Sequence, residues 1–106
     1  MQCCPECFGD RGLRLNIFPH LSTAKGRCSV CSAENQPLLN PKQLQEYFEL
    51  LVSAYRSDTN GKLLVHWFRN DWGLFSNSVM NEAKAKELLS EVLDDGEIVR
   101  KRFFPS

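Results

Sequence analysis

Two short stretches with the same spacing, Cys4-Pro5-Glu6-Cys7 and Cys28-Ser29-Val30-Cys31, decide how this chain folds. In each stretch a tight turn can bring two thiolates, three positions apart, onto one ion. Two such turns complete a tetrahedral set of four sulfur ligands, with Zn–S distances of about 2.3 Å. We therefore predict that Cys4, Cys7, Cys28 and Cys31 bind one structural Zn²⁺, with no open position for a substrate.

The cysteines also allow interpretations other than structural zinc. A mononuclear iron or an iron–sulfur cluster is held by the same kind of ligand set. A disulfide framework fits poorly, because the count of five cysteines is odd and a cytosol keeps thiols reduced. Cys3 is expected to be a small buried hydrophobe, with a substitute ligand or a redox-sensitive thiol as alternatives. His20 would replace a thiolate only if the sulfur set were incomplete.

The composition limits the class of protein. The chain has 106 residues, of which 42% are hydrophobic and 25% charged, with 13 basic residues against 13 acidic ones. This balance argues against a strongly basic nucleic-acid binder and against an acidic disordered tail. No apolar run approaches the roughly 20 residues that cross a bilayer, and the first residues lack the basic and apolar regions of a signal peptide. We expect a soluble, cytoplasmic protein with no membrane partner.

The segment between the cysteine pairs is predicted to be a strand. In Leu13-Arg14-Leu15-Asn16-Ile17 apolar and polar residues alternate, as on a half-buried strand. Pro19, Ser22 and Gly26 then indicate a turn before the second pair. Residues 1–36 are therefore expected to form a zinc ribbon, a β-hairpin with two knuckles whose folding depends on the metal.

Residues 37–106 carry helical patterns and are expected to form a small helical unit with a C-terminal strand. Asn40, Pro41 and Gln43 form a helix start, and the apolar stripe that follows predicts a helix as far as Asp58 to Gly61. Further helices are expected over residues 62–71 and 81–93, and a strand within residues 97–104, possibly beside the ribbon. The predicted fold class is α+β, with ribbon and helical unit in one compact domain.

Several features have a structural and a functional interpretation. The aromatic cluster is expected to fill the core rather than to stack bases, and His66 to lie at the surface or core edge. Basic residues near the cysteines are expected to balance the two net negative charges of four thiolates around Zn²⁺. Asp94 and Asp95 fit helix-end turn chemistry, and the basic run fits a charged strand edge. The aromatic cluster comprises Trp67, Phe68, Trp72 and Phe75; the basic residues are Arg11, Arg14, Lys25, Arg27 and the run Arg100-Lys101-Arg102.

Four stretches together carry a resemblance to a known family. They are Cys3-Cys4-Pro5-Glu6-Cys7-Phe8-Gly9-Asp10-Arg11-Gly12-Leu13, the second cysteine pair, Asp71-Trp72-Gly73-Leu74-Phe75, and Asp95-Gly96-Glu97-Ile98-Val99-Arg100-Lys101-Arg102-Phe103. With them the chain resembles the N-terminal zinc-binding domain of bacterial HEPN/RES proteins, over essentially its whole length.

The resemblance implies a module that precedes an effector, either an NAD-consuming RES domain or a HEPN ribonuclease, in toxin–antitoxin or phage-defence systems. It also implies that Cys4, Cys7, Cys28 and Cys31 are the metal ligands. The Arg and His of a HEPN site and the Arg, Glu and Ser of a RES site have no matching positions in this chain.

The expected function is thus a non-catalytic zinc-binding sensor or interaction module. The expected partner is an effector domain or a partner toxin or antitoxin protein. No Gly-rich phosphate loop and no nucleophile motif occurs, so we expect no catalysis by this chain. Two alternatives stay open: a nucleic-acid-binding zinc ribbon that uses the basic residues, and a subunit of an enzyme complex.

Overall fold

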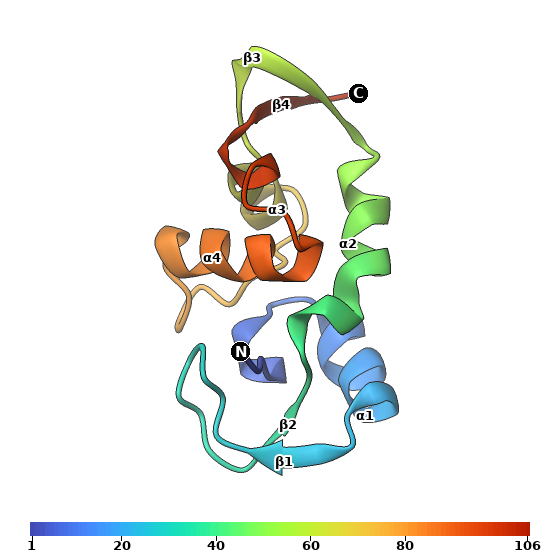
Figure 1. The fold of residues 1–106 in the computed structure, drawn as a ribbon, viewed down its shortest axis with the longest axis vertical. Helices are drawn as coiled ribbons and strands as arrows, with labels where there is room; N and C mark the ends of the chain where they lie inside the picture. Colours follow the sequence, from blue (N-terminus) through green and yellow to red (C-terminus); the bar gives the residue numbers. More distant parts are fainter.

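Four α-helices and two two-stranded antiparallel sheets make up the chain in a computed structural model that describes residues 1–106 (Figure 1). The predicted α+β class is confirmed. The molecule is elongated, with principal extents of 42 × 23 × 22 Å. One sheet lies at each end of the long axis and the helices lie between them (Figure 1).

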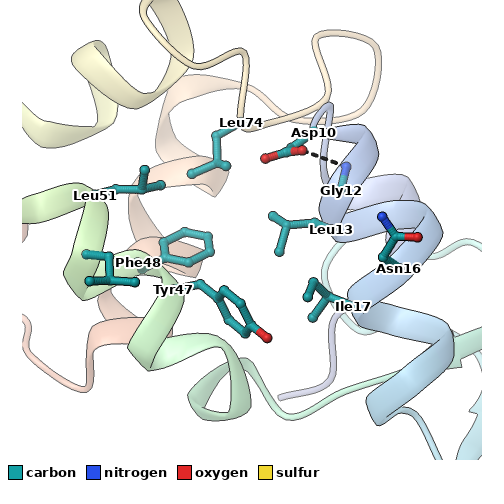
Figure 2. A pocket seen from close by; sticks show the side chains of 10 residues that line it. Asp10, Gly12, Leu13, Asn16, Ile17, Tyr47, Phe48, Leu51 and Leu74 are labelled. Atoms are coloured by element: carbon teal, nitrogen blue, oxygen red, sulfur yellow. Dashed lines mark hydrogen bonds between the residues drawn. The ribbon is translucent and has the colours of Figure 1, made fainter.

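The segment after the first cysteine pair is helical, so the strand expected over Leu13–Ile17 is wrong. The 3₁₀-helix η1 (Pro5–Cys7) is followed by a continuous helical segment over residues 11–21, which includes the π-helix η2 (Leu13–Ile17) and α1 (Phe18–Leu21). Leu13 and Ile17 lie one turn apart and face helix α2 (Gln45–Val52), as Figure 2 shows. Leu15 points away and is 61% exposed. The alternating pattern misleads because Leu13 and Ile17, four positions apart, lie on the same face both of a strand, with its period of two residues, and of a helix, with its period of 3.6 residues.

Pro19 explains why the stretch before it, η2, is a π-helix. Proline has no N–H to donate and its ring crowds the carbonyl of the preceding turn. Upstream of it the Phe18 N–H donates to the Leu13 carbonyl, five residues back, as in a π-helix. A π-turn of this kind lets a helix continue past a residue that an α-helix accommodates poorly.

The second cysteine pair lies at the tip of a short hairpin. Strands β1 (Ala24–Gly26) and β2 (Gln36–Leu38) pair antiparallel, with Lys25 opposite Pro37. An isolated bridge then joins Cys3 to Leu39, directly after β2. This hairpin flanks the second pair. The predicted hairpin, with a strand leaving the first pair and a return into the second, does not form, because the first pair leads into a helix.

The helix predicted from Asn40 begins as expected and ends early. The Asn40 side chain accepts a hydrogen bond from the Lys42 N–H (3.0 Å), and Gln43 Oε1 accepts one from the Asn40 N–H (3.1 Å). This capping box opens the 3₁₀-helix η3 (Pro41–Leu44), which continues into α2. The chain then turns into strand β3 (Tyr55–Leu63), so the expected continuation to Asp58–Gly61 is wrong. Ser, Asp, Thr, Asn and Gly fill the middle of β3, and all of them favour non-helical backbone.

The remaining elements agree with the predicted ones, apart from the position of the last strand. Helices α3 (Leu64–Asn70) and α4 (Glu82–Leu93) lie within the predicted ranges. A 3₁₀-turn η4 (Ile98–Arg100) precedes β4 (Arg102–Pro105). Strand β4 pairs antiparallel with β3, with Arg56 opposite Phe104, so it does not lie beside the hairpin of the second cysteine pair.

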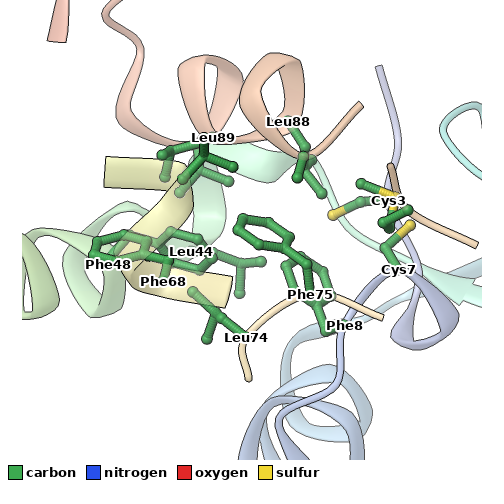
Figure 3. Packing of buried hydrophobic residues seen from close by; sticks show 14 of the residues in the cluster. Cys3, Cys7, Phe8, Leu44, Phe48, Phe68, Leu74, Phe75, Leu88 and Leu89 are labelled. Carbon is green, nitrogen blue, oxygen red and sulfur yellow. The ribbon is translucent and has the colours of Figure 1, made fainter. Parts of the chain in front are cut away.

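A single cluster of 24 buried residues runs through both halves of the chain (Figure 3). Phe8, next to the first cysteine pair, contacts Phe18, Phe48 and Phe75 at ring-centroid distances of 5.7, 6.2 and 6.1 Å. No charged or polar residue is buried. The cysteine-rich end and the helical end therefore share one core.

Candidate metal centre

Four sulfur atoms meet at the cysteine-rich end of the molecule. The Sγ atoms of Cys4, Cys7, Cys28 and Cys31 all lie within 4.8 Å of one another. The pairs Cys4–Cys31 and Cys7–Cys28 are each separated by 3.5 Å. Four sulfurs placed tetrahedrally at about 2.3 Å from one ion would be about 3.8 Å apart. The observed spacing fits a four-coordinate metal ion, and all of these cysteines are free thiols.

The first pair is positioned by a single turn of 3₁₀-helix. Pro5 occupies the first helical position, where its missing N–H costs nothing. The Cys7 N–H donates to the Cys4 carbonyl at 3.1 Å, which closes the turn and brings the two side chains to the same side. Both thiols are buried, with no exposed surface.

The second pair is positioned by a turn whose amides point at sulfur. The N–H groups of Val30 and Cys31 both donate to the Cys28 Sγ at 3.4 Å. Ser32 has a φ of 67°, and its N–H donates to the Cys28 carbonyl at 3.0 Å. N–H groups directed at a sulfur favour its ionised form, which is the form that binds metals.

The chain's first residues join the two pairs. Gln2 donates its N–H to Ser29 Oγ (2.8 Å), and its carbonyl accepts from the Ser29 N–H (3.2 Å). Cys3 exchanges two backbone hydrogen bonds with Leu39, at 2.8 and 3.0 Å. Sequence patterns did not reveal these contacts, because the atoms that make them belong mainly to the backbone.

The four thiols strongly affect one another's ionisation. Hydrogen bonds from the thiols of Cys4 and Cys7 hold the pKa of Cys28 well below its ordinary value. Hydrogen bonding to Cys28 raises the pKa of Cys4 to about 12. The pKa of Cys7 is also raised, by its hydrogen bonds to Cys28 and Cys4 and by burial. Four thiols this close to one another ionise together only beside a cation, and a bound metal ion would replace their protons.

Cys3 does not belong to the set of four. Its Sγ donates to the Leu39 carbonyl at 3.5 Å, and the residue is fully buried. Burial is the main reason why its pKa is raised to about 12. A neutral buried thiol of this kind agrees with the expectation of a small hydrophobe. His20 is exposed and is not among the clustered ligands.

The other candidate residues lie in structural roles or at the surface. Phe68 and Phe75 are core residues, as predicted, whereas Trp72 is 48% exposed and donates its indole N–H to Tyr55 Oη at 2.9 Å. The Trp67 indole N–H donates to the Phe103 carbonyl at 2.8 Å, and His66 is half-buried in the first turn of α3, with its ring beside the Asn70 side chain.

The charged candidate residues lie in ion pairs, in backbone hydrogen bonds or at the surface. Arg14 forms an ion pair with Glu6 at 3.3 Å, beside the first cysteine pair. Arg102 donates to the Gly61 carbonyl at 3.2 Å, and Arg100 lies 3.8 Å from Glu97. Asp95 Oδ1 accepts from the N–H groups of Glu97 and Ile98, so the turn chemistry predicted for this helix end is confirmed. Arg11, Lys25 and Arg27 are exposed.

Comparison of the chain with protein-family profiles, with curated protein sequences and with solved structures returned no match. None of its helices combines the length and the apolar character that a membrane crossing requires.

Proposed function

We propose that this chain is a non-catalytic zinc-binding module that recognises or regulates an effector protein. The supporting observation is the approach of four thiols to within 4.8 Å of one another. Four sulfur ligands are the set that structural Zn²⁺ prefers, and a set with no other ligand leaves no place for a substrate on the metal. Cys4, Cys7, Cys28 and Cys31 would hold the ion.

Four thiols can bind zinc or iron, and zinc is proposed because structural zinc sites are commonly built from four cysteines. A chain of this size buries a limited core, and a metal that ties two turns together adds directly to folding stability. The ion would join η1 to the hairpin tip, next to Phe8 and the shared aromatic core.

The proposed partner is the kind of effector that the sequence resemblance implies, a RES domain or a HEPN ribonuclease. In this hypothesis the metal holds the cysteine-rich end rigid, and the helical part presents a surface to the effector. The nucleic-acid alternative receives less support, because Arg14 is already paired with Glu6 and the numbers of acidic and basic residues are equal. Binding to oligonucleotides that weakens with salt would favour this alternative.

The test combines metal analysis with titration against an effector. We expect about one zinc per purified chain, and a colourless protein rather than one with the visible absorption of iron thiolates. We also expect saturable binding to a purified RES or HEPN protein encoded beside this chain. Iron in the sample would contradict the metal assignment, and absence of binding to either effector class would contradict the proposed partner.

A further inference from the structure

An apolar groove lies between the helical segment 11–21 and α2, away from the cysteines. It has a volume of about 370 Å³, and seven of its ten lining residues are hydrophobic. Leu13, Phe48 and Leu74 are buried and form its floor, and Ile17 and Leu51 form its half-buried walls (Figure 2). The floor belongs to the shared core, so the groove is an opening onto that core.

The rim of the groove exposes large apolar side chains on one helix. Tyr47 is 42% exposed and Leu50 is 72% exposed, and both are on α2. Single apolar residues on a surface are normal, but two that border an apolar depression form a continuous patch. A small ligand would be largely enclosed by its pocket, whereas this groove has the exposed Leu50 among its lining residues.

Acidic residues lie in the groove and beside it. Asp10 is the charged residue that lines it, and Glu46 and Glu49 line a neighbouring hollow on α2 that shares Leu50 with the groove. Neither glutamate forms a salt bridge, and no lysine or arginine lines the groove. Because the chain as a whole has equal numbers of acidic and basic residues, this acidity is local.

We propose that this groove docks a basic amphipathic helix of a partner protein. Helix α2 has eight residues, or about 12 Å of length, which matches roughly two turns of a docked helix. Apolar side chains spaced i, i+4 and i+7 would enter the groove, and flanking Lys or Arg side chains would face Asp10, Glu46 and Glu49. This inference rests on the proposed recognition function and names the surface and the chemistry of its partner.

The test uses the metal-loaded full chain and two designed peptides. One peptide has leucines at i, i+3, i+4 and i+7 and lysines elsewhere, and its twin has glutamates in place of the lysines. Binding is measured by fluorescence anisotropy. Leu50→Gln removes the exposed rim residue, and its matched control is Leu15→Gln, a leucine that is 61% exposed and lies outside the groove. Glu46→Lys/Glu49→Lys reverses the local charge, and Glu87→Lys/Glu91→Lys on α4 makes the same change in net charge elsewhere.

We expect the lysine peptide to bind at least about tenfold more tightly than its glutamate twin. Leu50→Gln should weaken binding about fivefold and the Glu46/Glu49 reversal about tenfold, while both controls stay within about twofold. Equal losses in groove and control variants, or no binding of the lysine peptide, would overturn the proposal. A concentration-dependent dimer that Leu50→Gln disrupts would also overturn it, because a second copy would then be the occupant.

Bound metal is measured in every variant, so that two kinds of failure are separated. A fully metal-loaded protein that ignores the lysine peptide refutes the groove and leaves the zinc module standing. A protein that binds the peptide but contains no zinc refutes the proposed metal and leaves the groove standing.

Discussion

Cys28 receives more hydrogen bonds than any other cysteine in the cluster. Two backbone N–H groups donate to its sulfur, and the Cys7 sulfur lies 3.5 Å away. Cys3 lies only one position from the ligand Cys4, yet its sulfur faces the Leu39 carbonyl. Two buried cysteines of the same chain are therefore expected to respond very differently to the same substitution.

Cys28→Ser should abolish stoichiometric zinc binding and lower the free energy of unfolding by at least about 3 kcal/mol, because one ligand and its thiolate are lost. Cys3→Ser is the control, and it should keep the metal at a cost of about 1 kcal/mol for a buried hydroxyl. Zinc content and urea unfolding measure both effects. Loss of metal in Cys3→Ser would assign Cys3 to the site.

Tyr55 provides a second prediction at the residue scale. Its hydroxyl donates to Asp71 Oδ2 and accepts from the Trp72 indole, both at 2.9 Å. Burial, followed by hydrogen bonding to Asp71, raises its pKa above the ordinary value of 10. A raised pKa means that the folded state binds the proton more tightly, so this contribution is present below pH 10 and is lost as pH rises past the folded pKa.

Urea unfolding at about pH 9 and about pH 11 should therefore show a smaller loss of stability with rising pH in Tyr55→Phe than in the unsubstituted chain. At neutral pH the variant should be less stable by about 1 kcal/mol, since the Trp72 N–H loses its acceptor. An identical pH dependence in the two proteins would show that Tyr55 does not titrate as described.

At the scale of elements, the sequence patterns located α2, α3 and α4, missed the helical segment 11–21 and misplaced strands. The caps and apolar stripes of α2 and α4 depend on nearby residues, and these are visible in the sequence. The cysteine spacing likewise predicted which four residues cluster. The pairing of β4 with β3 joins residues that are between 39 positions (Leu63 and Arg102) and 50 positions (Tyr55 and Pro105) apart, which no local pattern encodes. At Leu13–Ile17 the apolar residues at both ends fit the period of a strand and the period of a helix, and the contact of this segment with α2 determines that it is helical.

The close backbone contact between Gly9, which follows the first cysteine pair, and the loop at residues 73–76 gives a prediction at the scale of elements. The Gly9 N–H donates to the Leu74 carbonyl at 2.9 Å, and a Cβ on Gly9 would lie 2.5 Å from the Gly73 carbonyl oxygen. Gly9→Ala should therefore lower the free energy of unfolding by about 1 to 3 kcal/mol, because the backbone must shift to make room for the new methyl group. Gly96→Ala, where nothing lies within 4 Å, should change stability by less than about 0.5 kcal/mol. Equal unfolding midpoints for the two variants would contradict the close approach.

At the scale of the whole molecule, the shared core couples the metal end to the helices. Phe8 follows Cys7 directly and contacts Phe48 of α2 and Phe75 of the loop after α3. The cysteine pattern predicts that the folding of residues 1–36 depends on the metal, whereas the core crosses that boundary. We therefore expect chelation to lower the midpoint of one cooperative thermal transition, followed by circular dichroism, rather than to create two transitions. Two separate transitions would indicate that the helical part folds independently.

The most direct test is X-ray absorption at the zinc edge of the purified full chain. Four sulfur ligands at about 2.3 Å, with no nitrogen or oxygen in the coordination shell, are expected if the four thiols share one zinc ion. A shell that contains nitrogen or oxygen, or a protein without zinc, would contradict the four-thiolate centre.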